Sequence, residues 1–168
     1  MSTIISRNHY TLRPVAAAEN AAVANIIRTV MTEFGAVGQG YSIMDPEVDD
    51  MYGYYNHERA VYYVLEDPEG KLVGCGGIAQ LAGAGTEICE LKKMYFLPEA
   101  RGLGWGKTLI EVLETEAKAR GFQQMYLETI AAMEQANGLY KRMGFQPLPA
   151  QLGNTGHSAC GLFYIKAI

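Results

Sequence analysis

The sequence has few cysteines, no long hydrophobic run and no excess of basic residues, and each absence excludes a class of protein. The three cysteines, Cys75, Cys89 and Cys160, are too few and too scattered for a disulfide framework or a four-ligand zinc site. No apolar run approaches the roughly 20 residues that cross a bilayer. The net charge of −4 argues against a nucleic-acid surface, which carries clustered basic residues. We therefore expect small or cationic partners, and neither nucleic acid nor a membrane.

The N-terminal segment MSTIISRNHYTLRP lacks the basic start and continuous apolar stretch of a secretory signal, so a cytoplasmic location is expected. The 168 residues show no internal repeat, low-complexity tract or linker-like shift in composition. One domain spanning residues 1–168 is therefore predicted, and this length suffices for a hydrophobic core. A homodimer is expected only because dimers are common.

Hydrophobic periodicity predicts an order of elements that mixes helices and strands. Apolar residues recur at helical spacing from Val23 to Phe34, and Gly35 ends that helix. A second, shorter helix is predicted after Asp45-Pro46. The predicted order is a strand, two helices, three strands, a helix, a strand, a helix and two strands. The strands are expected near Tyr10–Arg13, Ala60–Glu66, Lys71–Ala79, Glu87–Phe96, Met125–Glu128, Phe145–Pro147 and Gly161–Lys166, and the later helices at Leu109–Arg120 and Met133–Met143.

The segment RGLGWGKTLI, residues 101–110, places three glycines on alternating positions before a predicted helix. It is not a nucleotide-triphosphate P-loop, because Arg101 stands where that motif needs a glycine. It is not a dinucleotide fingerprint either, since Lys107 or Leu109 would have to be the third glycine. Two interpretations stay open at this point: a loop whose backbone N–H groups bind an anion at the helix N-terminus, or a turn whose glycines only supply unusual backbone angles. Three largely antiparallel strands before the loop disfavour a nucleotide-binding fold.

Two segments in this order, LKKMYFLPEARGLGWGKTLIEVLE and ANGLYKRMGF, resemble the GNAT superfamily of acyl-CoA-dependent N-acyltransferases. The family's loop pattern is a Gln or Arg, two residues, Gly, one residue, and Gly or Ala; it is matched by Arg101, Gly104 and Gly106. A second pattern of Ala, three residues, Tyr and then Gly-Phe is matched by Ala136, Tyr140, Gly144 and Phe145. The likeness covers roughly Glu87 to Pro147, and the order of elements on both sides agrees with it.

The resemblance implies an α/β (α+β) fold, with a mixed, mostly antiparallel sheet of about six to seven strands, about four helices, and a splay between the fourth and fifth predicted strands. It implies acetyl-CoA as co-substrate and no metal, with the pyrophosphate on the N–H groups of the glycine loop and the pantetheine along the strand before it. The residues implied in cofactor binding are Met94, Tyr95, Phe96, Arg101, Gly102, Leu103, Gly104, Trp105, Gly106 and Lys107. Many members carry an Asn seven residues before the tyrosine; this chain has Met133 there, so no cofactor contact by that side chain is implied.

The resemblance also implies N-acetyltransferase activity, in which a primary amine attacks the thioester of acetyl-CoA directly in a ternary complex. An amine with a pKa of about 10 must lose a proton, and the departing thiolate benefits from a proton donor. Tyr140 matches the family position for that donor; the alternative is an aromatic on the core face of its helix. Glu90, on the strand before the loop, is the candidate base; the alternative is an ion pair with a lysine. Glu128 is a second candidate base, and a water chain without a dedicated base is a third possibility.

The acceptor is expected to be a small-molecule or peptide amine, and residues 41–55 match the family's variable lid over it. The acidic and aromatic residues of this lid would suit a cationic amine, although each acid alone also fits a solvated helix start. His157 and Cys160, in the C-terminal hairpin, are candidates to reach the acceptor cleft, and two donor residues do not make a metal site; a turn histidine and a buried thiol are the default alternative. Two other functions stay open: a non-catalytic acyl-CoA-binding module, and an NTPase, which Arg101 already disfavours.

Overall fold

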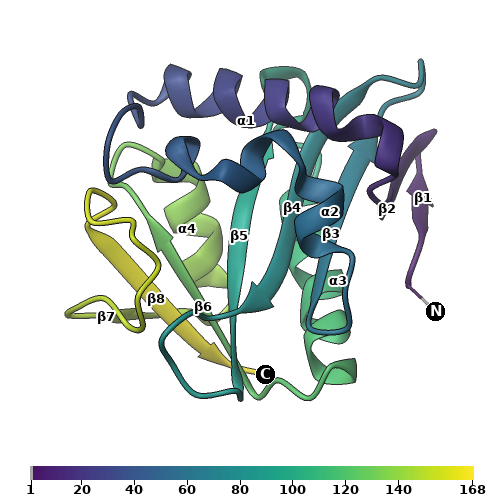
Figure 1. The fold of residues 1–168 in the computed structure, drawn as a ribbon. Coiled ribbons are helices and arrows are strands. Elements are labelled where there is room, and N and C mark those ends of the chain that lie inside the picture. Colours follow the sequence, from purple (N-terminus) through teal and green to yellow (C-terminus); the bar gives the residue numbers. More distant parts are fainter. Residues whose placement is uncertain (1) are drawn as a thin grey trace.

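The computed structural model describes residues 2–168, in which eight strands form one sheet in the order β1-β2-β3-β4-β5-β6-β8-β7 (Figure 1). All neighbouring strands are antiparallel except β5 and β6, which are parallel. The strands are β1 (Ile5–Arg7), β2 (Tyr10–Pro14), β3 (Ala60–Glu66), β4 (Leu72–Gln80), β5 (Ile88–Phe96), β6 (Gln124–Thr129), β7 (Gln146–Leu148) and β8 (Leu162–Ala167).

Four α-helices cover the sheet: α1 (Asn20–Glu33), α2 (Met51–Tyr55), α3 (Trp105–Ala119) and α4 (Glu134–Arg142). Helices α1 and α2 lie on one face, and α3 and α4 lie on the other (Figure 1). Single turns of 3-10 helix precede or connect them at Ala17–Glu19, Ser42–Met44, Pro46–Asp49 and Pro98–Ala100. The apolar periodicity of α1 explains its position, because Val23, Ile27 and Val30 are buried against the sheet. None of the helices in residues 2–168 has the length and apolar character needed to cross a membrane.

Strands β5 and β6 pair only at their beginnings. The parallel register joins Ile88 to Gln124, Cys89 to Met125 and Glu90 to Tyr126, and no later pair joins the two strands within the described residues. The remainder of β5, up to Phe96, therefore has an open edge toward β6. This is the splay that the resemblance implies between the fourth and fifth predicted strands.

A β-bulge interrupts β5 shortly after the splay begins. The register with β4 shifts between Cys75 and Gly77, and Lys93 has φ of +48°, which is rare for a residue with a side chain. The carbonyl of Lys93 accepts a hydrogen bond from the Tyr62 hydroxyl at 2.7 Å. A Cβ at Gly77 would lie 2.4 Å from the carbonyl oxygen of Val61, so the backbone around the bulge needs glycine at that position.

The predicted element order is confirmed, with two differences. The structure has an eighth strand, β1, which the sequence did not reveal because three mostly exposed residues show no usable periodicity. The predicted second helix, which begins after Asp45-Pro46, is one 3-10 turn, Pro46–Asp49, followed by the five-residue α2. Asp50 separates them, since its side chain accepts a hydrogen bond from the Gly53 N–H and starts a new helix there.

Candidate active site

A cleft opens where β5 and β6 part, and both predicted catalytic residues line it. Glu90 comes from β5 at the last paired position, and Tyr140 comes from α4. Two further segments close over the cleft: the lid, residues 41–55, and the C-terminal loop, residues 149–161, between β7 and β8. The two segments contact each other, because the Ala159 N–H donates a hydrogen bond to the Gly40 carbonyl at 3.1 Å, next to the lid.

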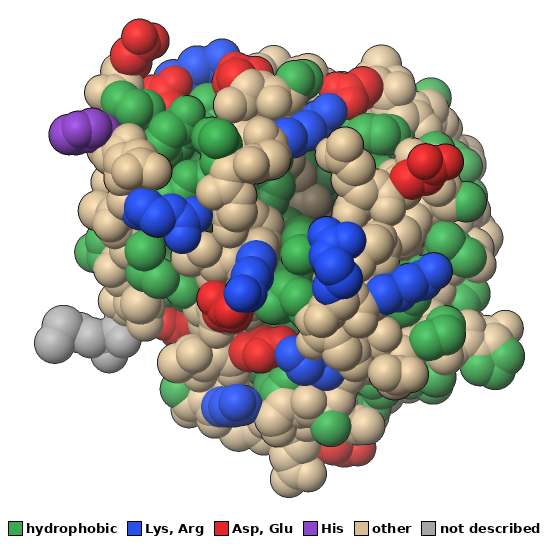
Figure 2. All heavy atoms as spheres, turned by 180° about the vertical axis from the view of Figure 1, so that it is seen from behind, with side chains coloured by type: hydrophobic (Ala, Val, Ile, Leu, Met, Phe, Trp, Pro, Cys, Tyr) green, Lys and Arg blue, Asp and Glu red, His purple; other side chains and the backbone are tan. Residues whose placement is uncertain are grey.

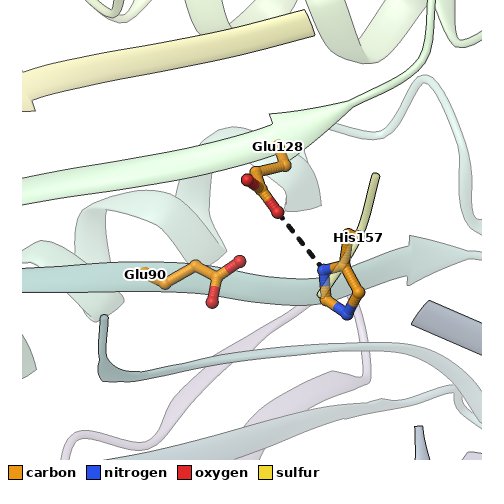
Figure 3. Close-up of side chains that lie close together, drawn as sticks. All are labelled: Glu90, Glu128 and His157. Carbon is orange, nitrogen blue, oxygen red and sulfur yellow. Dashed lines mark ion pairs between the residues drawn. The ribbon is translucent and has the colours of Figure 1, made fainter. Parts of the chain in front are cut away.

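Glu90 is buried but has no ion-pair or hydrogen-bond partner for its carboxyl group among residues 2–168. Its side chain is directed toward the space between Glu128 and His157 (Figure 3). Burial raises the pKa of Glu90 to about 7. The alternative interpretation, an ion pair with a lysine, is not realised, because Lys92 pairs with Glu47 at 3.1 Å instead. A carboxyl with a pKa near neutrality, facing a cleft, has the properties of a general base.

Glu128, the second candidate base, is fully engaged by hydrogen-bond donors. It accepts bonds from the Tyr126 hydroxyl at 2.6 Å, from Gln151 Nε2 at 2.7 Å and from the Thr155 hydroxyl. Nδ1 of His157 lies 3.3 Å from it. Burial acts to raise the pKa of Glu128, but these donors outweigh it and hold that pKa below its usual range. Glu128 is therefore a weaker base than Glu90.

The carboxylates of the lid already form ion pairs or hydrogen bonds with other residues of the protein. Lys93 is buried and forms ion pairs with Asp45, at 2.7 Å, and with Glu47. Asp49 pairs with Arg28 at 2.8 Å, and Asp50 caps α2. Because each of these acids already has a partner, the lid offers an incoming cationic amine little free negative charge. The interpretation of the acids as an amine-attracting surface is not supported by this arrangement.

Glu90, Glu128 and His157 form the tightest group of potential ligand atoms in residues 2–168, with all three atoms within 4.8 Å of one another (Figure 3). Both ring nitrogens of His157 face carboxylates, with Nε2 2.8 Å from Asp45. Burial acts to lower the pKa of His157, but Asp45 and Glu128 raise it to about 9. At neutral pH the ring is an imidazolium with two N–H donors, so no lone pair is free for a metal. The group is an ion-pair cluster, and the expectation of no metal stays a prediction.

Tyr140 is 6% exposed, and its ring packs against those of Phe145 and Tyr164 at centroid distances of 5.9 and 6.2 Å. Burial raises the pKa of its phenol, so the group keeps its proton at neutral pH. No hydrogen-bond acceptor for its hydroxyl occurs in the described part of the chain. Tyr140 therefore fits both interpretations, because its ring belongs to the hydrophobic core and its side chain also lines the cleft.

The glycine loop leads from β5 into α3 and exposes backbone donors. Gly102 and Gly104 have φ of +75° and +82°, the left-handed region that glycine tolerates, and Gly104 is the residue from which α3 starts. The N–H groups of Leu103–Lys107 find no backbone acceptor among residues 2–168, and the first helical bond runs from Thr108 to Gly104. On the face that carries α3 and α4, Lys and Arg side chains surround a hollow (Figure 2). This loop can bind an anion through its backbone.

The chain matches the profile of the Acetyltransferase (GNAT) family over residues 24–145. It belongs to the GNAT family. Among curated proteins it is 42% identical, over 158 residues and 94% of each chain, to the uncharacterized N-acetyltransferase YjgM of Escherichia coli (strain K12). With this relative and the family profile, the chain is an acetyltransferase.

Solved structures show the same fold. A GNAT-family acetyltransferase from Staphylococcus aureus Mu50 matches with a TM-score of 0.78 and 18% identity, over 94% of this chain and 98% of that one. A GNAT phosphinothricin acetyltransferase from Sinorhizobium meliloti, solved in complex with acetyl-CoA, matches with a TM-score of 0.75 and 24% identity, over 95% and 89% of the two chains. The mixed sheet and four helices of this chain are the GNAT fold.

Within this GNAT fold, the predicted cofactor residues differ in whether their side chains are exposed or already bound to other residues. Arg101 is held by Glu33, at 2.7 and 3.1 Å, and by the Phe96 carbonyl. Trp105 is 2% exposed beneath the guanidinium of Arg7. Lys107 is exposed, and Met94, Tyr95 and Met133 line the cleft. At the buried Trp105 only the backbone is available to a ligand, whereas the Arg101 side chain is partly exposed and paired with Glu33.

The sequence did not reveal Lys93 or the partners of His157 in this cleft. A turn histidine was the default expectation for His157, but the structure bears out the alternative that it reaches the cleft, where it is buried between Asp45 and Glu128. Cys160 also lines the cleft, and burial raises the pKa of its thiol to about 12, so it stays protonated. A lone histidine in a turn-rich segment carries no spacing signal, and its partner Asp45 lies 112 positions earlier. The charged pair Lys92-Lys93 within a buried strand was the one available hint.

Proposed function

We propose that this GNAT enzyme transfers an acetyl group from acetyl-CoA to a primary amine by direct attack in a ternary complex. The observation that carries the proposal is Glu90, a buried carboxyl with no partner and a pKa of about 7 at the point where β5 and β6 part. Such a group can take a proton from an ammonium bound in the cleft.

The backbone supports acetyl-CoA as the co-substrate. The unpaired N–H groups of Leu103–Lys107 would bind the pyrophosphate, and the open edge of β5 at Met94–Phe96 would pair with the pantetheine. This path brings the thioester to the split between the strands, beside Glu90 and Tyr140. The Sinorhizobium meliloti neighbour, a protein of the same fold, was solved with acetyl-CoA, which agrees with this choice.

In the proposed reaction the acceptor ammonium loses two protons and the departing thiolate gains one. Glu90 takes a proton from the acceptor ammonium, and the neutral nitrogen attacks the thioester carbonyl carbon. The C–S bond then breaks as the C–N bond is completed, and the departing thiolate takes the proton of the Tyr140 hydroxyl. The nitrogen loses its second proton as the amide forms, and this proton replaces the one that Tyr140 gave to the thiolate. Glu90 releases the first proton to solvent, so the products are the acetylated amine, CoA and one proton. No cysteine acts as an acyl carrier, which agrees with the protonated state of Cys160.

Thiol release from acetyl-CoA, followed with a panel of primary amines, tests this function. With amines of pKa about 10, we expect Glu90→Gln to lower kcat/KM by about 10²- to 10⁴-fold, because the base is lost while the shape of the side chain is kept. With an amine that is already neutral at the assay pH, the loss should be much smaller. Absence of thiol release with every amine, or an unchanged rate in Glu90→Gln, would contradict the proposal.

A further inference from the structure

His157 connects two elements that border the cleft, the lid and strand β6. Its Nε2 lies 2.8 Å from Asp45 of the lid, and its Nδ1 lies 3.3 Å from Glu128 of β6. The side chain is 7% exposed and comes from the C-terminal loop, so neither of these elements supplies it. Figure 3 shows the Glu90 carboxyl directed toward this ring and toward Glu128, without reaching an ion-pair partner.

The charged groups around Glu90 have no net charge when Glu90 itself is left out. Three cations face this part of the cleft, and three carboxylates other than Glu90 pair with them: Lys92, Lys93 and His157 against Asp45, Glu47 and Glu128. Other titratable groups nearby have raised pKa values that leave them neutral: Tyr55, Cys89, Tyr95, Tyr126, Tyr140 and Cys160. An ionised Glu90 is therefore one negative charge in excess, and the surrounding cations decide whether it can form.

Lys92 and then His157 are the cations that most favour an ionised Glu90, and His157 is the one that the C-terminal loop contributes. Its ring nitrogen and the Glu90 oxygen are both within the 4.8 Å cluster, a range in which an opposite charge favours the ionised carboxyl. Without the imidazolium, Asp45 would keep Lys93 and Glu128 would keep three hydrogen-bond donors. Both carboxylates would stay charged, and Glu90 would face them without a compensating cation on that side.

We propose that His157 is a positioning residue for acetyl transfer that acts through Glu90: its imidazolium binds Asp45 and Glu128, and its charge allows the unpartnered Glu90 to ionise in the cleft. The inference rests on the proposed role of Glu90 as the base. It assigns to the C-terminal loop a part in the reaction, in addition to covering the cleft.

The pH dependence of kcat/KM between about pH 5.5 and 9, measured for full-length variants, tests this role. The acid limb of this profile is the pH range in which kcat/KM falls as Glu90 becomes protonated. His157→Gln should move it to higher pH by about one unit, since a neighbouring charge shifts a carboxyl pKa by that order. Activity at pH 6 should then fall about tenfold, while activity at pH 9 stays within about threefold of wild type. His157→Lys keeps a positive charge and should leave the limb close to the wild-type position.

Asp45→Asn is the matched control, because it breaks the same 2.8 Å contact with the opposite change in charge. Its acid limb should stay in place or move to lower pH. Equal losses at every pH in both variants would overturn the inference and leave His157 as a structural clamp. Should His157→Gln fail to fold, His157→Asn takes its place, and an acid limb that stays at the wild-type position in that variant would overturn the inference.

Glu90→Gln separates failure of this inference from failure of the proposed function. If Glu90→Gln loses the acid limb but His157→Gln does not move it, only the role of His157 is wrong. If Glu90→Gln retains the limb, the base has been misassigned, and both proposals fail.

Discussion

Tyr140 holds its proton in a buried position, and the loss of its hydroxyl should affect the reaction far more than the fold. We expect Tyr140→Phe to lower kcat by about 10²- to 10³-fold, because the leaving thiolate loses its proton donor, with little change in KM for acetyl-CoA. The ring contacts with Phe145 and Tyr164 remain, so the free energy of unfolding should change by about 1 kcal/mol or less. Steady-state kinetics and urea unfolding measure the two effects.

Tyr164→Phe is the control for this prediction, because the Tyr164 ring packs on Tyr140 but is not among the residues that line the cleft. It should retain kcat. If both variants keep full activity, water protonates the thiolate and Tyr140 is only a core aromatic.

Single residues also show where sequence reasoning was sufficient and where it was not. Tyr140 and Glu90 were identified because the family patterns fix their positions on a helix and a strand, and both line the cleft. Whether each one acts in catalysis stays a prediction. The lack of an ion-pair partner for Glu90 among residues 2–168 was not predictable. It arises because Lys92 forms its ion pair with Glu47, which lies in a distant segment of the sequence.

The glycine loop and α3 carry a prediction at the scale of the element. A residue with a side chain at Gly104, where φ is +82°, costs about 1–2 kcal/mol, and it would distort the loop whose N–H groups we propose bind the pyrophosphate. We expect Gly104→Ala to weaken acetyl-CoA binding about tenfold or more, measured by calorimetric titration. Gly121→Ala, with φ of +83° at the other end of α3, should lose similar stability but bind acetyl-CoA normally. Equal affinities in the two variants would argue that the loop backbone does not hold the cofactor.

Elements with strong periodicity and end signals were predicted well, and α3, which Gly121 follows, is the clearest case. The lid was predicted less well. Its apolar residues fit a helical period, but the Asp50 side chain bonds the Gly53 backbone and the chain forms separate turns. A capping contact of this kind overrides periodicity over so short a segment.

At the scale of the whole molecule, most neighbouring strands of the sheet are consecutive in the sequence, but β8 lies between β6 and β7. The site likewise depends on contacts that the order of elements does not contain. The splay of β5 and β6 leaves an open strand edge, and the lid and the C-terminal loop meet across it through Asp45 and His157. These residues are 112 positions apart, and ion pairs at such separation leave no periodic trace in a single sequence. The structure was needed to bring the acceptor side together.

Binding of the co-substrate along this split should be measurable as a change in the stability of the whole chain. At 100 times its Kd, acetyl-CoA should raise the free energy of unfolding by about 2.7 kcal/mol, which for 168 residues is a rise in Tm of roughly 5–11 °C. CoA should act similarly, because the pyrophosphate and pantetheine contacts do not involve the acetyl group. Mg-ATP should produce no shift, since Arg101 replaces the glycine that a P-loop needs. A shift with Mg-ATP alone would mean that the loop binds a different phosphate ligand, and the assignments of Glu90 and Tyr140 would then lose the cofactor on which they depend.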